Sequence, residues 1–315
     1  MPESKPRGVE FQWEELTLAG TLHLPASPGP YPAVLMMQGS GPTDRDNNGY
    51  FIPIREAFLD RGIAVFSFDK PGVGESMGEW RDYALEGRAQ QATAAIDHLT
   101  GLADIDGERV GVWGHSQGGW LAQILASRLP GLAFAICNSG PAIGLEAQDL
   151  YGCENTMRAG GHTEAEIEEA LGFLRSLHSQ ALMETDYADV EELLLRTARA
   201  EPWYGYLTID DEADWAFACT ALQERYDPSE ALTRISCPYL AIYGGLDLLV
   251  PAWESAKITG DSLDHAPTTD TMVVVFPAGD HRIQDPDTGR LLTGYFDLIG
   301  GWAARRVADV DRLLS

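Results

Sequence analysis

The chain has 315 residues, 44% of them hydrophobic, so it can bury a sizeable core in one large domain or two smaller ones. Its formal net charge of −26 would repel a phosphate backbone, and no basic stretch interrupts the acidity, which argues against a nucleic-acid partner. The four cysteines are far apart and show no Cys-x-x-Cys spacing, so neither a metal site nor a disulfide framework is expected.

Targeting signals are not evident in the sequence. Residues 1–10 are polar and contain two prolines, so they lack the apolar core of a signal peptide. No apolar run elsewhere has the length of a membrane span. We therefore expect a cytoplasmic protein without a membrane partner. The sequence does not determine an oligomeric state, and a homodimer is kept as one assembly to test.

In chain order, residues 9–18 and 20–24 are predicted strands of an opening hairpin, joined through Ala19-Gly20. Apolar strand-like segments and amphipathic helical segments then alternate. The predicted strands are 33–37, 63–68, 110–113, 133–137, 239–243 and 271–276, and the predicted helices are 54–60, 83–99, 117–128 and 295–314. This alternation is typical of an α/β protein with a mostly parallel sheet that helices cover on both faces.

The alternation stops between 141 and 236, where apolar residues recur at helical spacing among many acidic ones. We interpret 141–236 as a helical insertion into a core formed by residues 1–140 and 237–315. The second half of the insertion is rich in aromatic side chains, among them Trp203, Tyr204, Tyr206 and Trp215.

Ser116 lies in Gly-His-Ser-Gln-Gly, between the predicted strand 110–113 and the predicted helix 117–128. A sharp strand-to-helix turn lifts a serine hydroxyl clear of the sheet edge, and glycines two residues to either side avoid a collision. The helix that starts at Gln117 presents its first backbone N–H to an oxyanion formed on a substrate that Ser116 attacks. The motif in this context predicts a nucleophilic serine.

With this motif the chain resembles the α/β-hydrolase superfamily over nearly its whole length. The stretch Gly-Ser-Gly-Pro-Thr-Asp-Arg-Asp from residue 39 is similar to a subgroup of serine esterases and peptidase-related hydrolases. The resemblance implies an α/β-hydrolase fold with a doubly wound, mostly parallel sheet. It also implies that nucleophile, acid and histidine follow one another in that order, each after a strand.

Asp247 follows the predicted strand 239–243 and matches the acid position of the family. Its alternative interpretation is an aspartate in a surface turn. The other acid position used in the family follows the strand 133–137, where the chain has no carboxylate but only Asn138, Ser139 and Gly140. That absence favours Asp247.

His281 follows the predicted strand 271–276 and matches the histidine position of the family. We expect its imidazole to accept the proton of Ser116, with Asp247 fixing the tautomer. Asp280 is kept only as a minor alternative acid, because neighbouring residues in an extended loop point apart. His115, beside the serine, is expected to be a packed or hydrogen-bonding residue and not the base.

The resemblance also implies a second oxyanion donor and a cap. The glycine-rich loop after strand 33–37 offers the backbone N–H of Ser40 beside that of Gln117. The insertion 141–236 occupies the place of the family's cap, or lid. Its aromatic residues either line a substrate pocket or form the small core of the cap itself, and the sequence does not decide between these.

The sequence thus predicts a serine hydrolase that cleaves a carboxylic ester of a small molecule through an acyl-enzyme, with no cofactor and no metal. One alternative is acyl transfer, elimination or lyase chemistry on a specialised natural-product intermediate, because a fold does not fix the reaction. Another alternative is a non-catalytic receptor for a small molecule. The intact set of serine, acid and histidine argues against the receptor.

Overall fold

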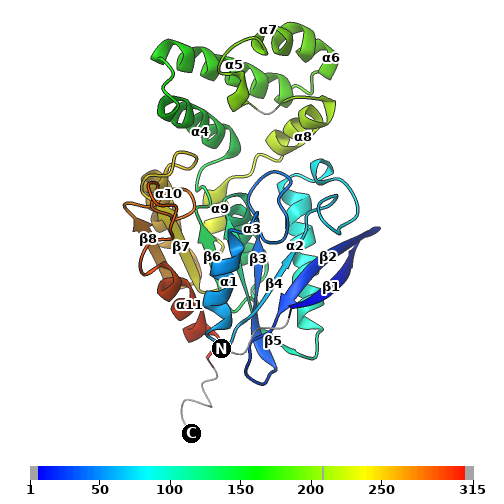
Figure 1. Cartoon of the computed structure of the whole chain (residues 1–315), viewed down its shortest axis with the longest axis vertical. Helices are drawn as coiled ribbons and strands as arrows, with labels where there is room; N and C mark the ends of the chain where they lie inside the picture. The colour runs from blue at the N-terminus through cyan, green and yellow to red at the C-terminus, as the bar shows by residue number, and fades with distance from the viewer. Residues whose placement is uncertain (1–5, 208, 309–315) are drawn as a thin grey trace.

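A computed structural model describes residues 6–207 and 209–308. Eight strands form one sheet in the order β1-β2-β4-β3-β5-β6-β7-β8 (Figure 1). The strands β1 and β2 pair antiparallel with their neighbours, and all pairs from β4 to β8 are parallel. The strands are Pro6–Trp13, Leu16–His23, Tyr31–Met37, Ala64–Phe68, Ile105–His115, Ala135–Asn138, Tyr239–Gly244 and Thr271–Phe276. The mostly parallel sheet confirms the predicted fold class.

Helices cover both faces of this sheet. One face packs against α1 (Phe51–Leu59) and α11 (Tyr295–Arg306), and the other packs against α2 (Leu85–Thr100), α3 (Gln117–Arg128) and α10 (Ala252–Leu263). Side chains of β3 show why. Val34 and Met36 pack in the apolar cluster with α1 and α11, whereas Leu35 packs in the cluster on the opposite face, with α2, α3 and α10. Alternate residues of a strand point to opposite faces, so a strand buried on both sides is apolar throughout.

The opening hairpin differs from its prediction. Its turn lies at Glu14 and Glu15, between β1 and β2, and Glu14 has a φ of 50°. Gly20 instead lies within β2, where a Cβ atom would come within 2.6 Å of the Phe66 ring on β4. The prediction was wrong because this glycine serves a close approach between strands and not a turn.

Two helices of the structure also differ from what the sequence predicts. The helix α10 between β7 and β8 was not predicted, although its buried stripe includes Ala252, Ser255 and Thr259. Small and polar residues make that stripe a weak apolar signal. The last helix, predicted over 295–314, ends at Arg306 in the structure, and residues 309–314 of the prediction lie outside the described residues.

The helices of the insertion form a separate layer above the carboxyl ends of the strands (Figure 1). This layer, called the cap below for its position alone, has its own apolar cluster, which includes Ile167, Leu171 and Leu174 of α5. Its elements are α4 (Leu145–Ala159), α5 (Glu164–Leu182), α6 (Tyr187–Val190), η2 (Glu191–Leu195), α7 (Arg196–Ala198), η3 (Tyr204–Tyr206) and α8 (Glu212–Gln223). A further short turn, η1 (Trp80–Asp82), contacts α8 from the core.

The short helix α9 (Pro228–Leu232) does not belong to this layer. It contacts α3 and α10, and Leu232 and Ile235 lie in the core cluster. The cap helices therefore end before α9, earlier than the boundary expected at 236. Acidic and polar residues on both sides of α9 hide this change of partner in the sequence.

Candidate active site

Ser116 lies at the turn between β5 and α3 with φ 57° and ψ −117°, a backbone conformation that non-glycine residues rarely adopt. Glycines make the turn feasible, since a Cβ atom at Gly114 would lie 1.8 Å from the carbonyl oxygen of Gly118. A Cβ atom at Gly118 would lie 2.2 Å from the carbonyl oxygen of Met37. Close packing on both sides therefore holds Ser116 in this strained position, half-buried at the wall of a cavity.

Asp247 and His281 lie in the loops that follow the neighbouring strands β7 and β8 and contact each other directly. The distance from Asp247 Oδ2 to His281 Nδ1 is 2.7 Å. The Asp247 side chain is fully buried, and its Oδ1 accepts hydrogen bonds from the backbone N–H groups of Leu249 and Val250, at 2.8 and 3.0 Å. These bonds fix the carboxylate with Oδ2 facing His281, and an acceptor at that position favours the His281 tautomer that carries its proton on Nδ1.

Asp280 is turned away from this pair. Its Oδ1 accepts hydrogen bonds from the backbone N–H groups of Arg282 and Gln284, at 2.8 and 2.9 Å. The carboxylate therefore stabilises the turn of the loop that follows it. This geometry gives Asp280 no contact with His281 among the hydrogen bonds of the described residues.

His115 and Asn138 form a buried polar network behind the serine. Asn138 Nδ2 lies 3.2 Å from His115 Nδ1, and Asn138 Oδ1 accepts a hydrogen bond from the Tyr295 hydroxyl at 2.9 Å. Burial is the main cause that lowers the pKa of His115 well below its ordinary value, so the ring is neutral. The centroid of that ring lies 4.8 Å from the centroid of His281, which it supports from one side.

The loop after β3 lies against the serine. A Cβ atom at Gly39 would be 3.3 Å from Ser116 Cβ, so only a glycine lets the backbone come this close without displacing its neighbour. Ser40 and Gln117 line the same cavity as Ser116. As the first residue of α3, Gln117 has a backbone N–H that the helix itself does not use.

The buried Lys70 side chain supports this loop and was not singled out from the sequence. Its Nζ donates hydrogen bonds to the carbonyl oxygens of Gly39 and Gly41, the latter at 2.6 Å. Burial, and then the positive charge of Arg88, lower the pKa of Lys70 well below its ordinary value. The residue lies two positions after the end of β4, which is a signal that could have indicated a position at this edge of the sheet.

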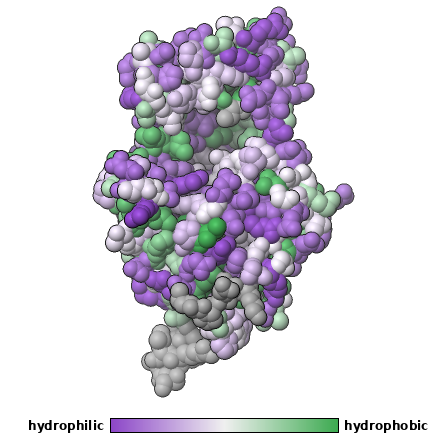
Figure 2. All heavy atoms as spheres, in the orientation of Figure 1, coloured by the Kyte–Doolittle hydropathy of each residue, from purple (hydrophilic) through white to green (hydrophobic). Residues whose placement is uncertain are grey.

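A cavity of about 1070 Å³ lies between the core and the cap and has Ser40, Ser116 and Gln117 at its core side. Figure 2 shows apolar residues gathered where the surface is hollowed between the two layers. Of the four expected aromatic residues, Tyr206 and Trp215 line this cavity. Trp215 also donates a hydrogen bond from Nε1 to the Thr185 carbonyl at 2.8 Å.

Trp203 and Tyr204 lie elsewhere, which corrects the expectation for these two residues. Both belong to the apolar cluster of the cap, where the Trp203 ring packs 5.3 Å from that of Phe173. The Tyr204 hydroxyl donates to the carbonyl of Ile209. A small group of helices needs large rings to fill its own interior, and these two residues serve there. Phe217 and Tyr226, which belong to the same aromatic-rich segment of the sequence, also line the cavity, as do Trp80 and Trp120, which the sequence did not single out.

Residues 26–291 match the family described as the alpha/beta hydrolase family. The chain belongs to this family. Among curated relatives, it is 38% identical to 2,6-dihydropseudooxynicotine hydrolase of Paenarthrobacter nicotinovorans over 119 residues, 38% of this chain and 31% of that protein. It is 26% identical to esterase EstD of Thermotoga maritima over 247 residues, 76% of this chain and 53% of that protein. The chain thus spans about a third to a half of the length of these relatives.

Solved structures share the fold of this family member. The crystal structure of 2,6-dihydroxy-pseudo-oxynicotine hydrolase aligns with a TM-score of 0.62 at 21% identity, covering 98% of this chain and 69% of that one. An esterase of Pyrococcus furiosus aligns with a TM-score of 0.66 at 16% identity, covering 97% and 92%.

Two further findings concern the described residues alone. No cluster of three or more His, Cys, Asp or Glu side chains is arranged there to hold a metal ion. Within the same ranges, no helix combines the length and the apolar character that a membrane span requires.

Proposed function

We propose that this α/β-hydrolase family member is a serine hydrolase that cleaves carboxylic esters of small molecules through an acyl-enzyme. The observation that carries the proposal is the buried Asp247–His281 pair in the loops beside the strained Ser116 turn. A serine hydroxyl is hardly ionised near neutral pH, so it needs an imidazole to accept its proton. The relatives named esterase and hydrolase support this class of reaction.

In the proposed reaction, Ser116 Oγ attacks the ester carbonyl while His281 Nε2 accepts its proton. Asp247 keeps the other ring nitrogen protonated and stabilises the imidazolium. The backbone N–H groups of Ser40 and Gln117 hold the oxyanion of the tetrahedral intermediate. His281 then gives the proton to the leaving alcohol, and water, activated by the same imidazole, releases the acid from Ser116.

We further propose that the helices α4 to α8 act as a cap that excludes water and shapes the acyl pocket. The cavity between them and the core extends from Ser116 to α5 and α8. Exclusion of water strengthens the electrostatic interactions in the site and positions the substrate for attack.

The proposal predicts that a fluorophosphonate probe labels the wild-type protein covalently and that Ser116→Ala abolishes the labelling. Labelling is read by intact-protein mass spectrometry, and hydrolysis of p-nitrophenyl acetate is measured in parallel. Ser139→Ala is the matched control, because Ser139 is a buried serine with positive φ at the neighbouring strand end. A folded wild-type protein that is neither labelled nor active would contradict the proposal.

The large, capped cavity also suits acyl transfer, elimination or lyase chemistry on a specialised substrate. Hydrolysis in heavy-oxygen water distinguishes these reactions. An acid product that carries the heavy oxygen supports hydrolysis, whereas a product without it supports the alternative chemistry.

A further inference from the structure

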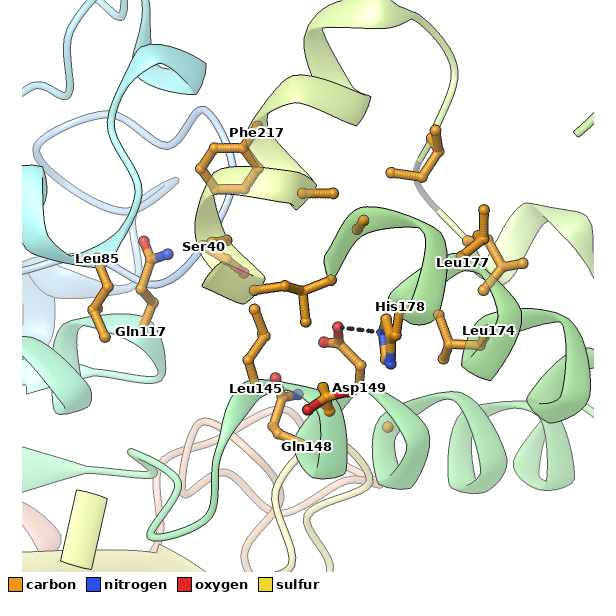
Figure 3. Close-up of a pocket in the computed structure, with 18 of the residues that line it drawn as sticks. Ser40, Leu85, Gln117, Leu145, Gln148, Asp149, Leu174, Leu177, His178 and Phe217 are labelled. Carbon is orange, nitrogen blue, oxygen red and sulfur yellow. Dashed lines mark ion pairs between the residues drawn. The ribbon is translucent and has the colours of Figure 1, made fainter. Parts of the chain in front are cut away.

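Asp149 and His178 form a polar pair in the cap wall of the cavity. Asp149 lies on α4 and His178 on α5, and Figure 3 shows the two side chains facing each other. The distance from Asp149 Oδ2 to His178 Nε2 is 3.3 Å. Both residues line the cavity that also contains Ser116, although neither is near it in the sequence.

The position of His178 is unusual for its helix. The buried stripe of α5 otherwise consists of apolar residues such as Leu174, Leu177 and Ala181. The His178 side chain is 7% exposed, and its Nδ1 has no hydrogen bond among the described residues. An imidazole placed in an apolar wall loses hydration, and this loss needs compensation from a polar partner. One such partner is Asp149, and the free ring nitrogen leaves room for another.

The carboxylate of Asp149 is also incompletely paired. It is 37% exposed, and within the described ranges His178 is its one ion-pair or hydrogen-bond partner. Other carboxylates in the cavity wall have other tasks: Asp214 pairs with Arg81, and Glu224 accepts two backbone N–H groups at the start of α2. Asp149 therefore has acceptor capacity directed at the cavity.

The charge of the cavity wall indicates what this acceptor would bind. Among the described lining residues, five carry carboxylates and one, Arg225, carries a guanidinium. Glu146 and Asp210 are exposed, whereas Asp149 is half-buried beside the His178 ring and apolar side chains of α5. A cation or strong hydrogen-bond donor is the ligand group that gains most from this environment.

We propose that Asp149, positioned by His178, binds a protonated amine of the substrate, at a point of the cavity separate from the ester carbonyl. This inference rests on the proposed function and specifies its substrate class: an ester whose apolar body carries a basic nitrogen. His178 Nε2, 3.3 Å from Asp149 Oδ2, restrains the carboxylate at the cavity wall, and apolar residues of α5 flank the ring.

The kinetic test compares p-nitrophenyl aminohexanoate with p-nitrophenyl heptanoate, which replaces the ammonium group by a methyl group. We expect the wild-type protein to show a KM for the amino ester that is lower by about tenfold to a hundredfold, as for a hydrogen bond to a charged group. Asp149→Asn should bring the two KM values close together and leave the hydrolysis of p-nitrophenyl acetate unchanged.

Glu146→Gln is the matched control. It removes the same charge from the same helix, one turn earlier, without contacting His178, and should keep the preference for the amino ester. His178→Gln places an amide N–H donor beside Asp149 and should largely keep the preference for the amino ester. His178→Leu should lose this preference. Equal KM values for both esters in the wild type, or an unchanged preference in Asp149→Asn, would overturn the proposal.

A binding experiment separates this proposal from the proposed function. Calorimetry with Ser116→Ala measures the affinity for the intact amino ester and for the heptanoate without turnover. Tighter binding of the amino ester that disappears in the Ser116→Ala, Asp149→Asn double variant supports the amine site even if the wild type hydrolyses neither ester. Equal binding of both esters contradicts the amine site even if acetate is hydrolysed.

Discussion

Lys70 has a buried amino group that donates to two backbone carbonyls and pairs with no carboxylate among the described residues. Among the described residues it has no ion-pair partner, and Arg88 nearby is also buried. Burial without a counter-ion is unfavourable, and such a group persists where its hydrogen bonds fix something else. Here they fix the carbonyls on both sides of Ser40, and thereby the direction of the Ser40 N–H.

We therefore predict that Lys70→Met lowers kcat for p-nitrophenyl acetate by about tenfold to a hundredfold, somewhat less than removal of an oxyanion donor would. The KM should change little, because the proposed contact of the Ser40 N–H forms with the oxyanion of the transition state and not with the bound ester. Steady-state kinetics and the affinity for a boronic acid transition-state analogue are the measurements. Lys257→Met, which removes an exposed lysine of α10, is the control. An unchanged kcat in Lys70→Met would show that the loop holds its shape without this lysine.

Among the elements of the cap, α5 supplies more of the apolar cluster than any other, and it forms part of the cavity wall. Its first turn is closed by a capping box, in which Thr163 Oγ1 accepts from the Glu166 N–H and Glu166 Oε2 accepts from the Thr163 N–H at 2.8 Å. A capping box satisfies two backbone N–H groups at the start of a helix that would otherwise be unpaired. The start of α5 thus depends on a short local motif, while its middle depends on packing.

Thr163→Ala is expected to destabilise the cap by about 1 kcal/mol, the typical cost of losing an N-cap side chain. Hydrogen exchange of the α5 amides measures this local stability, and the exchange should accelerate while the amides of β5 remain protected. Ser176→Ala lies on the same helix, where the serine donates to the Gly172 carbonyl, and should leave exchange nearly unchanged. Equal effects of the two substitutions would contradict the stabilising role of the Thr163 capping box.

At the scale of the whole molecule, buried histidines connect folding stability to pH. Burial, with a smaller effect of Arg55, lowers the pKa of His23 from 6.5 to about 4, and burial lowers that of His115 as well. Below pH 6.5 the unfolded chain binds protons at these residues that the folded chain does not bind. The free energy of unfolding therefore falls as the pH falls from about 6.5 toward 4.

We predict that His23→Gln loses less stability than the wild type between pH 7 and pH 4.5, because it removes one group that protonates only on unfolding. Urea unfolding followed by tryptophan fluorescence at both pH values gives the difference. His265→Gln, at an exposed position, should keep the wild-type pH dependence. The same slope in His23→Gln and the wild type would show that His23 is not a source of the acid sensitivity.

Much of the fold was readable from the sequence because its signals are local. Apolar runs that alternate with amphipathic segments predicted the parallel sheet, and Gly-x-Ser-x-Gly between a strand and a helix predicted the turn at Ser116. Asp247 and His281 were singled out by their places after two strands, and the carboxyl ends of neighbouring parallel strands meet at one edge of a sheet. The catalytic roles of the three residues stay predictions, whereas the contact between Asp247 and His281 is a feature of the structure.

Only the tertiary structure decided which side chains fill which space. The turn predicted at Gly20 is absent because the glycine instead makes room for Phe66, which lies on another strand. Trp203 and Trp215 both lie in the aromatic-rich half of the insertion. Trp203 fills the interior of the cap, whereas Trp215 lines the cavity. Asp149 and His178 lie on two different helices, and only the packing of α4 against α5 brings their side chains together. Periodicity and motifs are properties of a segment, but packing depends on partners that are remote in the chain, so the sequence determined the frame of the site and the folded structure determined its walls.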